Sequence, residues 1–136
     1  MGITDLLFGK KKVPEFSAGV FSIDTNMHPF RIAAHKADYA QLDITVTNKF
    51  DKELLTSITI TVPKALGFEQ SQLSHQREIR AGTLAPGESK SIRVQVWGSG
   101  RTDPGNHEIK IFAMSHYRDY TYVLNEVRKT VELRAA

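Results

Sequence analysis

Residues 81–97 read A-G-T-L-A-P-G-E-S-K-S-I-R-V-Q-V-W. Pro86 and Gly87 predict a tight turn, because proline fixes φ at the first corner and glycine adopts the positive φ that follows. After this turn, apolar residues alternate with polar residues from 91 to 97. A period of two is typical of a strand with one face in a core and one in water. The other segments are organised as further strands around this one.

Segments on both sides of this strand carry the same signals, namely alternation or β-branched residues bounded by turn residues. The segments expected to be strands are 19–23, 30–34, 42–47, 54–62, 78–84 and 107–114. The runs at 42–47 and 54–62 are expected to pair antiparallel through the loop between them. Residues 65–78 lack a clear period and are expected to cross between sheets.

The last segment, 120–133, is ambiguous by spacing alone. Val123, Val127 and Val131 lie four apart, as on a helix face, but they also share the odd parity of a strand. Branched residues lose rotamer freedom in a helix and pack well on a pleated sheet, so a strand is the interpretation. Because it is longer than most strands, a bulge or bend is expected near Asn125.

Seven or eight short strands with scarcely any helix predict an all-β fold, an antiparallel immunoglobulin-like β-sandwich. A chain of 136 residues is expected to form one domain, here 13–136, after a short helical leader at 1–12. The chain has no cysteine, which excludes disulfides and thiolate metal sites and suits the cytoplasm. Without the leader, 15 basic residues oppose 14 acidic residues, so nucleic-acid binding is not expected.

Three pieces of the sequence resemble a known module. They are V-T-N at 46–48, L-A-P-G-E-S at 84–89 and P-G-N-H-E-I-K-I at 104–111. This pattern resembles the immunoglobulin-like prokaryotic modules called CARDB and NEW3, over roughly half of the chain. The resemblance implies a β-sandwich that works as an accessory or binding domain. It transfers no site residue, because the matching positions are turn and core positions.

Motifs for catalysis are missing from the sequence. The five histidines show neither H-x-H nor H-x-x-x-H spacing, so no metal site is expected. Gly98 and Gly100 precede a strand rather than the helix that a phosphate-binding loop needs. Ser74 and His75 belong to no nucleophile elbow. The chain is therefore interpreted as a non-enzyme without a cofactor.

Residues 116–122 read H-Y-R-D-Y-T-Y and form the most distinctive polar cluster. Tyrosine and arginine dominate interface hot spots. The candidate partner-binding residues are Tyr117, Arg118, Tyr120 and Tyr122. The alternative is that the tyrosines cover one end of the sandwich while the charged residues are solvated. An exposed sheet edge is a second candidate surface, for a partner strand or for a homodimer.

Two other functions stay open. A small-ligand or glycan-binding module follows only from the family resemblance, with Trp97 as a candidate stacking residue. A peripheral membrane protein follows from the leader, where a short apolar run precedes three lysines. The candidate membrane-binding residues are Ile3, Leu6, Leu7, Phe8, Lys10, Lys11 and Lys12.

The membrane hypothesis predicts that the full chain co-sediments with anionic liposomes. Removal of 1–12 and an increase in salt should each reduce the bound fraction, because the leader supplies both the apolar contact and the lysines. Equal sedimentation of the full chain and a chain that begins at Val13 would contradict a role of the leader.

Overall fold

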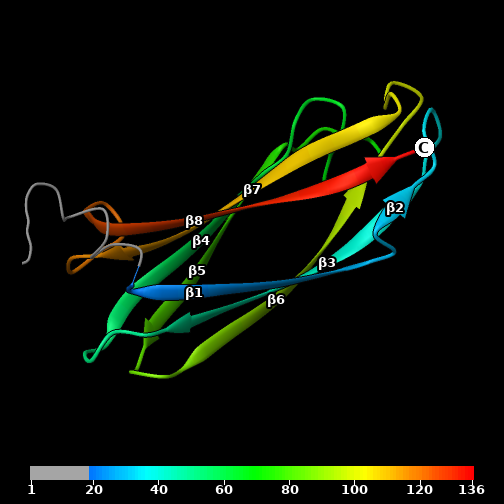
Figure 1. Ribbon diagram of the computed structural model, residues 1–136. Coiled ribbons are helices and arrows are strands. Elements are labelled where there is room, and N and C mark those ends of the chain that lie inside the picture. The colour runs from blue at the N-terminus through cyan, green and yellow to red at the C-terminus, as the bar shows by residue number, and fades with distance from the viewer. Residues whose placement is uncertain (1–18) are drawn as a thin grey trace, which may run out of the picture.

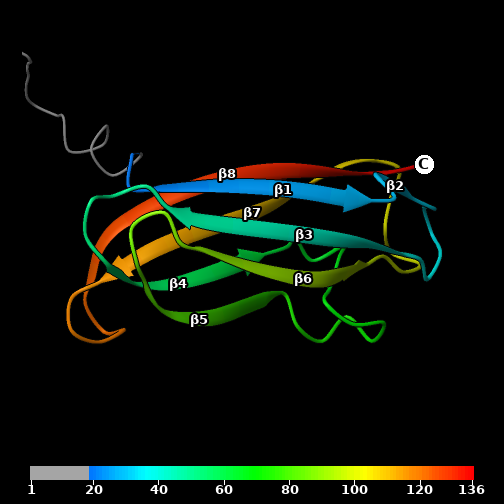
Figure 2. The ribbon, with the colours of Figure 1, turned by 90° about the horizontal axis from the view of Figure 1, so that it is seen from below.

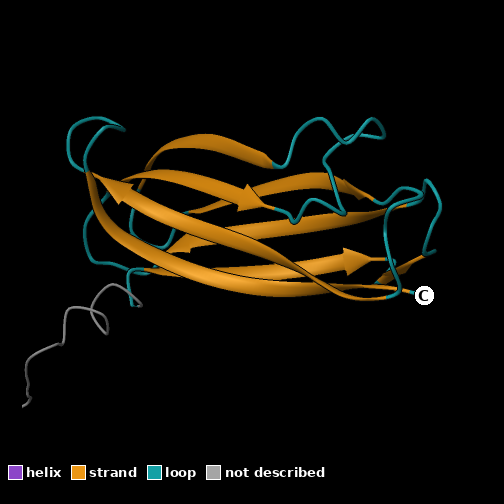
Figure 3. Cartoon of the chain, turned by 90° about the horizontal axis from the view of Figure 1, so that it is seen from above, coloured by secondary structure: helices purple, strands orange, loops and turns teal. Residues whose placement is uncertain are grey.

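The computed structural model describes residues 19–136, and these residues form eight strands and no helix (Figures 1 and 3). The strands are β1 (Phe21–His28), β2 (Arg31–Ile32), β3 (Tyr39–Asn48), β4 (Leu54–Thr61), β5 (Gln76–Leu84), β6 (Ser89–Trp97), β7 (Gly105–His116) and β8 (Val123–Ala135). The leader predicted at 1–12 lies outside the described residues.

The strands form two stacked sheets, which confirms the predicted β-sandwich (Figure 2). One sheet has the order β1-β3-β6 and the other has the order β2-β8-β7-β4-β5. One end of the sandwich carries the connections 49–53, 85–88 and 117–122, and the other end carries 29–38, 62–75 and 98–104. Within 19–136 no segment is a helix that could span a bilayer.

Alternating apolar side chains from both sheets fill the space between them. Every second residue of β3 from Ala40 to Val46 is fully buried, and so are Ile109 and Ile111 of β7. The predicted strand after Pro86-Gly87 is β6, whose Val94 and Val96 point into this core. The period of two therefore assigned the inner face of these strands correctly.

The turn before β6 has the predicted geometry. Gly87 has a φ of 81°, and the N–H of Glu88 donates to the carbonyl of Ala85 at 2.9 Å. These features define a type II turn with Pro86 at its first corner. This turn passes the chain from the five-stranded sheet to the three-stranded sheet.

Two expectations about pairing are wrong. β3 does not pair with β4, because 49–53 carries the chain to the other sheet, where β4 pairs with β5 and β7. Residues 62–75 do not cross between sheets, since β4 and β5 are neighbours in one sheet. Periodicity indicates which face of a strand is buried, but not which strand lies beside it.

The first strand is longer than expected and the second is shorter. β1 continues to His28 because β3 offers eight registered partners, from Asn48 opposite Phe21 to Gln41 opposite His28. β2 keeps only two residues, which pair parallel to the last residues of β8. The ambiguous last segment is a strand, with a register shift opposite Ser115 and His116 that leaves Leu124 as the extra residue. This confirms the predicted bulge near Asn125.

Asn48 connects three segments at the 117–122 end of the sandwich. Its buried Nδ2 donates to the carbonyls of Lys52 and Leu84, both at 2.9 Å, and its Oδ1 accepts from the N–H of Phe50 at 2.8 Å. Its backbone also bonds to the 85–88 turn, with Asn48 N to Glu88 O at 3.0 Å and Gly87 N to Asn48 O at 2.8 Å. The V-T-N and L-A-P-G-E-S motifs are therefore in direct contact.

Asn48→Ala should lower the free energy of unfolding by about 2 to 4 kcal/mol, because it removes three side-chain hydrogen bonds and leaves the buried carbonyl of Leu84 without a donor. Urea unfolding followed by circular dichroism measures this change. Asn26→Ala, on the exposed face of β1, is the matched control and should cost less than about 0.5 kcal/mol. Similar losses in both variants would contradict a special role of Asn48.

Candidate interaction surfaces

The loop 117–122 joins β7 to β8 and projects from one end of the sandwich (Figure 1). Three backbone hydrogen bonds shape it: Tyr117 N donates to Tyr122 O at 3.0 Å, Asp119 N to Tyr117 O at 2.7 Å, and Tyr122 N to Asp119 O at 3.4 Å. Asp119 Oδ1 also accepts from the N–H of Thr121 at 2.8 Å. Arg118 takes a φ of 67°, which this tight turn imposes on a non-glycine residue. The loop is therefore a defined turn.

Tyr120 points back onto the domain and supports the loop from below. Its hydroxyl accepts a hydrogen bond from the N–H of Gly82 on β5 at 3.0 Å. The guanidinium of Arg80 lies 4.8 Å from the centre of its ring, and the ring of His116 meets it edge-on at 5.1 Å. Tyr120 therefore connects the loop to two strands of the five-stranded sheet.

His116 forms the buried base of the loop. Its side chain is only 7% exposed, and its Nε2 lies 2.7 Å from the hydroxyl of Ser57 on β4. Its Nδ1 is buried without a hydrogen-bond partner. His116 is thus a packed contact between strand and loop.

Four large side chains at the loop are exposed. Tyr117, Tyr122, Val123 and Leu124 are 51%, 60%, 52% and 57% exposed, respectively. We call these four residues the tip patch. The guanidinium of Arg118 stacks over the ring of Tyr117 at 5.1 Å and adds a positive charge to the patch.

The candidate residues from the sequence therefore divide into two groups. Tyr117, Arg118 and Tyr122 lie together at the surface, whereas Tyr120 supports them from below. Val123 and Leu124 extend the surface but were interpreted only as the start of a strand. The bulge expected near Asn125 was the signal that could have indicated Leu124. A bulged residue is unpaired, so its side chain does not follow the alternation of buried and exposed positions along the strand. The candidate membrane-binding residues at 3–12 lie outside the described residues.

Trp97, the candidate sugar-stacking residue, lies at the end of β6 on the outer face of the three-stranded sheet. Its ring packs on Tyr39 with centroids 4.6 Å apart, and its Nε1 donates to Gln95 Oε1 at 3.2 Å. The indole is half-buried in this contact. It works at least as a packing residue between β3 and β6.

The free edge of β6 is a regular sheet edge, because β6 pairs with β3 without a register shift. Trp97 exchanges two backbone hydrogen bonds with Gly67, at 2.8 and 2.9 Å, on the side away from β3. Because hydrogen-bonded and non-hydrogen-bonded pairs alternate along an antiparallel ladder, Gln95, Arg93 and Ser91 also direct their N–H and C=O groups outward. By contrast, β8 carries the Leu124 bulge, and Lys129 Nζ donates across the gap to the carbonyl of Ile23 at 3.2 Å. Bulges and inward charges protect an edge against pairing.

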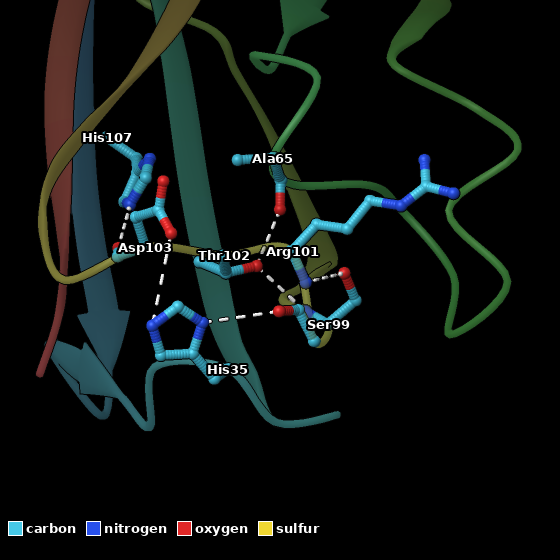
Figure 4. Close-up of polar contacts among 8 residues, drawn as sticks. His35, Ala65, Ser99, Arg101, Thr102, Asp103 and His107 are labelled. Atoms are coloured by element: carbon cyan, nitrogen blue, oxygen red, sulfur yellow. Dashed lines mark hydrogen bonds and ion pairs between the residues drawn. The ribbon is translucent and has the colours of Figure 1, made fainter.

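Histidines at the 98–104 end hold loops together (Figure 4). His35 Nδ1 lies 3.2 Å from the carbonyl of Gly100, and its Nε2 lies 3.9 Å from Asp103 Oδ1. His107 Nε2 lies 2.8 Å from the carbonyl of Asp103. Within 19–136, no group of three or more histidine, aspartate or glutamate side chains could hold a metal ion.

Comparison with protein families finds no match, and comparison with curated proteins finds none. Solved structures do match. The CARDB domain of a Pyrococcus furiosus protein, solved in complex with di-metal ions, has a TM-score of 0.53 at 17% identity, over 85% of this chain and 87% of that chain. The fold is that of a CARDB-type module. This agrees with the resemblance found in the sequence motifs.

Two further structures match over most of this chain. Native alpha-2-macroglobulin from Escherichia coli, from domain MG7 to the C-terminus, has a TM-score of 0.64 at 19% identity, over 88% of this chain and 17% of that chain. The fold of this chain thus corresponds to a small part of that protein. AvmM, which catalyses macrocyclization in alchivemycin A biosynthesis, has a TM-score of 0.60 at 9% identity, over 87% of this chain and 89% of that chain. At these identities the likeness shows the fold alone.

Tyr120→Phe should lower the free energy of unfolding by about 1 kcal/mol, because the N–H of Gly82 loses its acceptor. Tyr122→Phe removes the same atom from an exposed ring and should change stability by less than about 0.5 kcal/mol. Thermal and urea unfolding of both variants measure the difference. If Tyr122→Phe were the more destabilising change, the assignment of Tyr120 as the supporting residue would be wrong.

Proposed function

We propose that this chain is a non-enzymatic, adaptor-like protein-interaction module that binds a protein partner through the tip patch. The observation that carries the proposal is the grouping of two tyrosines, a valine and a leucine, each more than half exposed, in one loop and the start of one strand. Grouped exposed apolar side chains at a loop typically mark a contact site. Tyrosine and arginine are also the residue types that contribute most at interfaces.

The support below the patch favours binding. Tyr120, His116 and Ser57 fix the base of the loop through the contacts at 3.0, 5.1 and 2.7 Å described above. A surface held in one conformation before binding loses less conformational entropy when a partner docks. The buried residues at the base of the loop therefore stabilise the domain and also favour a higher affinity of the tip patch for a partner.

The charges at the tip indicate what kind of surface a partner should have. Arg118 has no carboxylate within 4 Å among the described residues, whereas the carboxylate of Asp119 already accepts a hydrogen bond from Thr121. The tip thus combines apolar rings with a cation that has no ion-pair partner within 4 Å among the described residues. The complementary partner is a folded protein with an apolar groove and an acidic rim. Since the chain has no cysteine, the proposed location is the reducing cytoplasm.

A membrane surface is the second candidate partner, and one observation favours it. β1 begins at the same end of the sandwich as the loop 117–122 (Figure 2). A leader with three lysines precedes β1 in the sequence, and a single weak anchor needs a second contact for stable binding. In this alternative, Val123 and Leu124 supply that second contact.

A second copy of the chain is the proposed partner for the β6 edge. Ser91, Arg93 and Gln95 offer free backbone groups, and β-strand addition uses such groups for affinity. Antiparallel pairing would bring the Arg93 side chains of the two copies near each other, although each already bonds to Asp43 at 2.8 Å in its own copy. A homodimer formed this way leaves the tip patch free for the protein partner.

Photo-crosslinking from the tip tests the proposal. With p-benzoylphenylalanine in place of Tyr122, one protein should be captured that is not captured from Phe30, an exposed residue at the opposite end. Once that protein is identified and purified, Leu124→Ser and Tyr117→Ser should each weaken its binding by about tenfold or more. Phe30→Ser should bind as the unchanged chain does.

The outcomes separate the candidates. Lipid adducts at Tyr122 in place of a protein adduct would favour the membrane alternative. Equal capture from Tyr122 and Phe30, or unchanged affinity of Leu124→Ser, would contradict the tip patch as the binding surface.

A further inference from the structure

A second surface at the opposite end of the sandwich has the chemistry of an anion site. A hollow of about 570 Å³ lies between the β4–β5 connection and the β6–β7 loop. Its lining consists of Lys64, Gln70, Ser71, Gln72, Leu73, His75, Ser99 and Arg101. We propose that this hollow binds a small organic molecule that carries a phosphoryl group. This site is separate from the tip patch and does not depend on the function proposed for it.

Hydrogen bonds between the two loops build the hollow. Gln72 Nε2 donates to the carbonyls of Ala65 and Trp97 at 3.1 and 2.9 Å. The hydroxyl of Thr102 donates to the carbonyl of Ala65 at 2.7 Å, so both loops share this acceptor. Gly67 packs so closely that a Cβ there would lie 2.7 Å from the Cα of Gln72. The walls are therefore fixed to each other without a ligand.

The turn that presents Arg101 is also fixed. Ser99 N donates to Thr102 Oγ1 at 2.8 Å, and Arg101 N donates to Ser99 Oγ at 3.1 Å. Figure 4 shows the side chain of Arg101 extending away from His35 and Asp103, toward the side of the β4–β5 connection. The guanidinium is thus directed to the hollow and away from the nearby carboxylate of Asp103.

The charges of the lining are uncompensated. Lys64 and Arg101 carry positive charge, no carboxylate belongs to the lining, and neither cation has an ion-pair partner within 19–136. Glu69 is the neighbouring acid, and its Oε1 accepts from the N–H of Ser74 at 2.6 Å. Apart from Lys64 and Arg101, 13 basic residues oppose 14 acidic residues after position 12, so the other charges of the body nearly balance. Two unpaired cations in one hollow are therefore a local feature.

The donors match a phosphoryl group. A guanidinium offers a planar pair of N–H donors, and an ammonium offers a compact charge, which together suit several oxygens of one group. Ser71 and Ser99 can add hydroxyl donors. His75 Nδ1 donates to the carbonyl of Leu66 at 2.8 Å, which fixes its ring in the lining. The hollow falls within the range of about 300 to 1,000 Å³ typical of small-molecule sites.

The exposed apolar side chain of Leu73 favours an organic phosphate over inorganic phosphate. Leu73 is 83% exposed and lines the hollow together with Gln70. An apolar side chain and an amide can pack on the organic part of a ligand, but they give nothing to inorganic phosphate. The organic phosphate should therefore bind more tightly than phosphate alone.

Amide chemical shifts of the full chain at low salt test this inference, with adenosine 5′-monophosphate, inorganic phosphate and adenosine as probes. Adenosine 5′-monophosphate should shift the amides of 70–73 and 99–101 in a saturable way. Inorganic phosphate should shift the same amides at several-fold higher concentration, and adenosine should shift none. Arg101→Ala and Lys64→Ala should each raise the Kd by about tenfold, and Arg101→Lys by less.

Lys49→Ala removes an exposed charge at the other end of the sandwich and should leave the Kd unchanged, as a matched control. Arg101 and Lys64 are exposed, so their variants should keep the unfolding midpoint of the unchanged chain. Shifts confined to the lysines at 10–12, or Arg101→Ala and Lys64→Ala variants that bind with unchanged Kd, would overturn the inference. Equal Kd values for inorganic phosphate and adenosine 5′-monophosphate would contradict the inference that the ligand is an organic phosphate.

Discussion

Asn48 hydrogen-bonds to both connections that pass between the sheets at one end of the sandwich. Residues 49–53 leave β3 for the five-stranded sheet, and 85–88 return to β6. Each passage exposes backbone groups that no strand can pair, and a buried unpaired group costs as much as a lost hydrogen bond. The amide of Asn48 bonds to Leu84, Lys52 and Phe50, and its backbone bonds to the 85–88 turn. The stacking of the two sheets depends on this one residue at that end.

This rigid frame gives the two ends of the molecule different surfaces. At one end, β7 and β8 present a short loop whose supporting residues are buried and whose outer residues are apolar. At the other end, the long connections 62–75 and 98–104 bond to each other and leave a hollow that carries cations. Tyr117, Tyr122 and the lining of the hollow lie on connections, where side chains are free from the alternation that the core requires, whereas Val123 and Leu124 begin β8.

The parts of the structure that follow from periodicity could be predicted from the sequence. The inner faces of β6 and β7, the strand character of β8 and its bulge follow from alternation and branched residues. The partner of β3 could not be predicted, because pairing depends on contacts far apart in the chain. In the loop 117–122 the sequence offered three similar tyrosines, and only the contacts of the folded domain, such as the acceptor role toward Gly82, separate Tyr120 from the other two. The cationic hollow joins Lys64 and Arg101, which are too distant in sequence to form a motif.

β1 and β8 run in the same direction in different sheets, so Gly19 and Ala136 lie at opposite ends of the sandwich. A force that pulls on these two points would act along the strands. All eight registered pairs between β1 and β3 would then have to slide past each other at once, and so would the twelve between β7 and β8. Loaded in shear, hydrogen bonds share the force instead of opening one after another. A pull on these two points therefore loads the β1–β3 and β7–β8 ladders in shear.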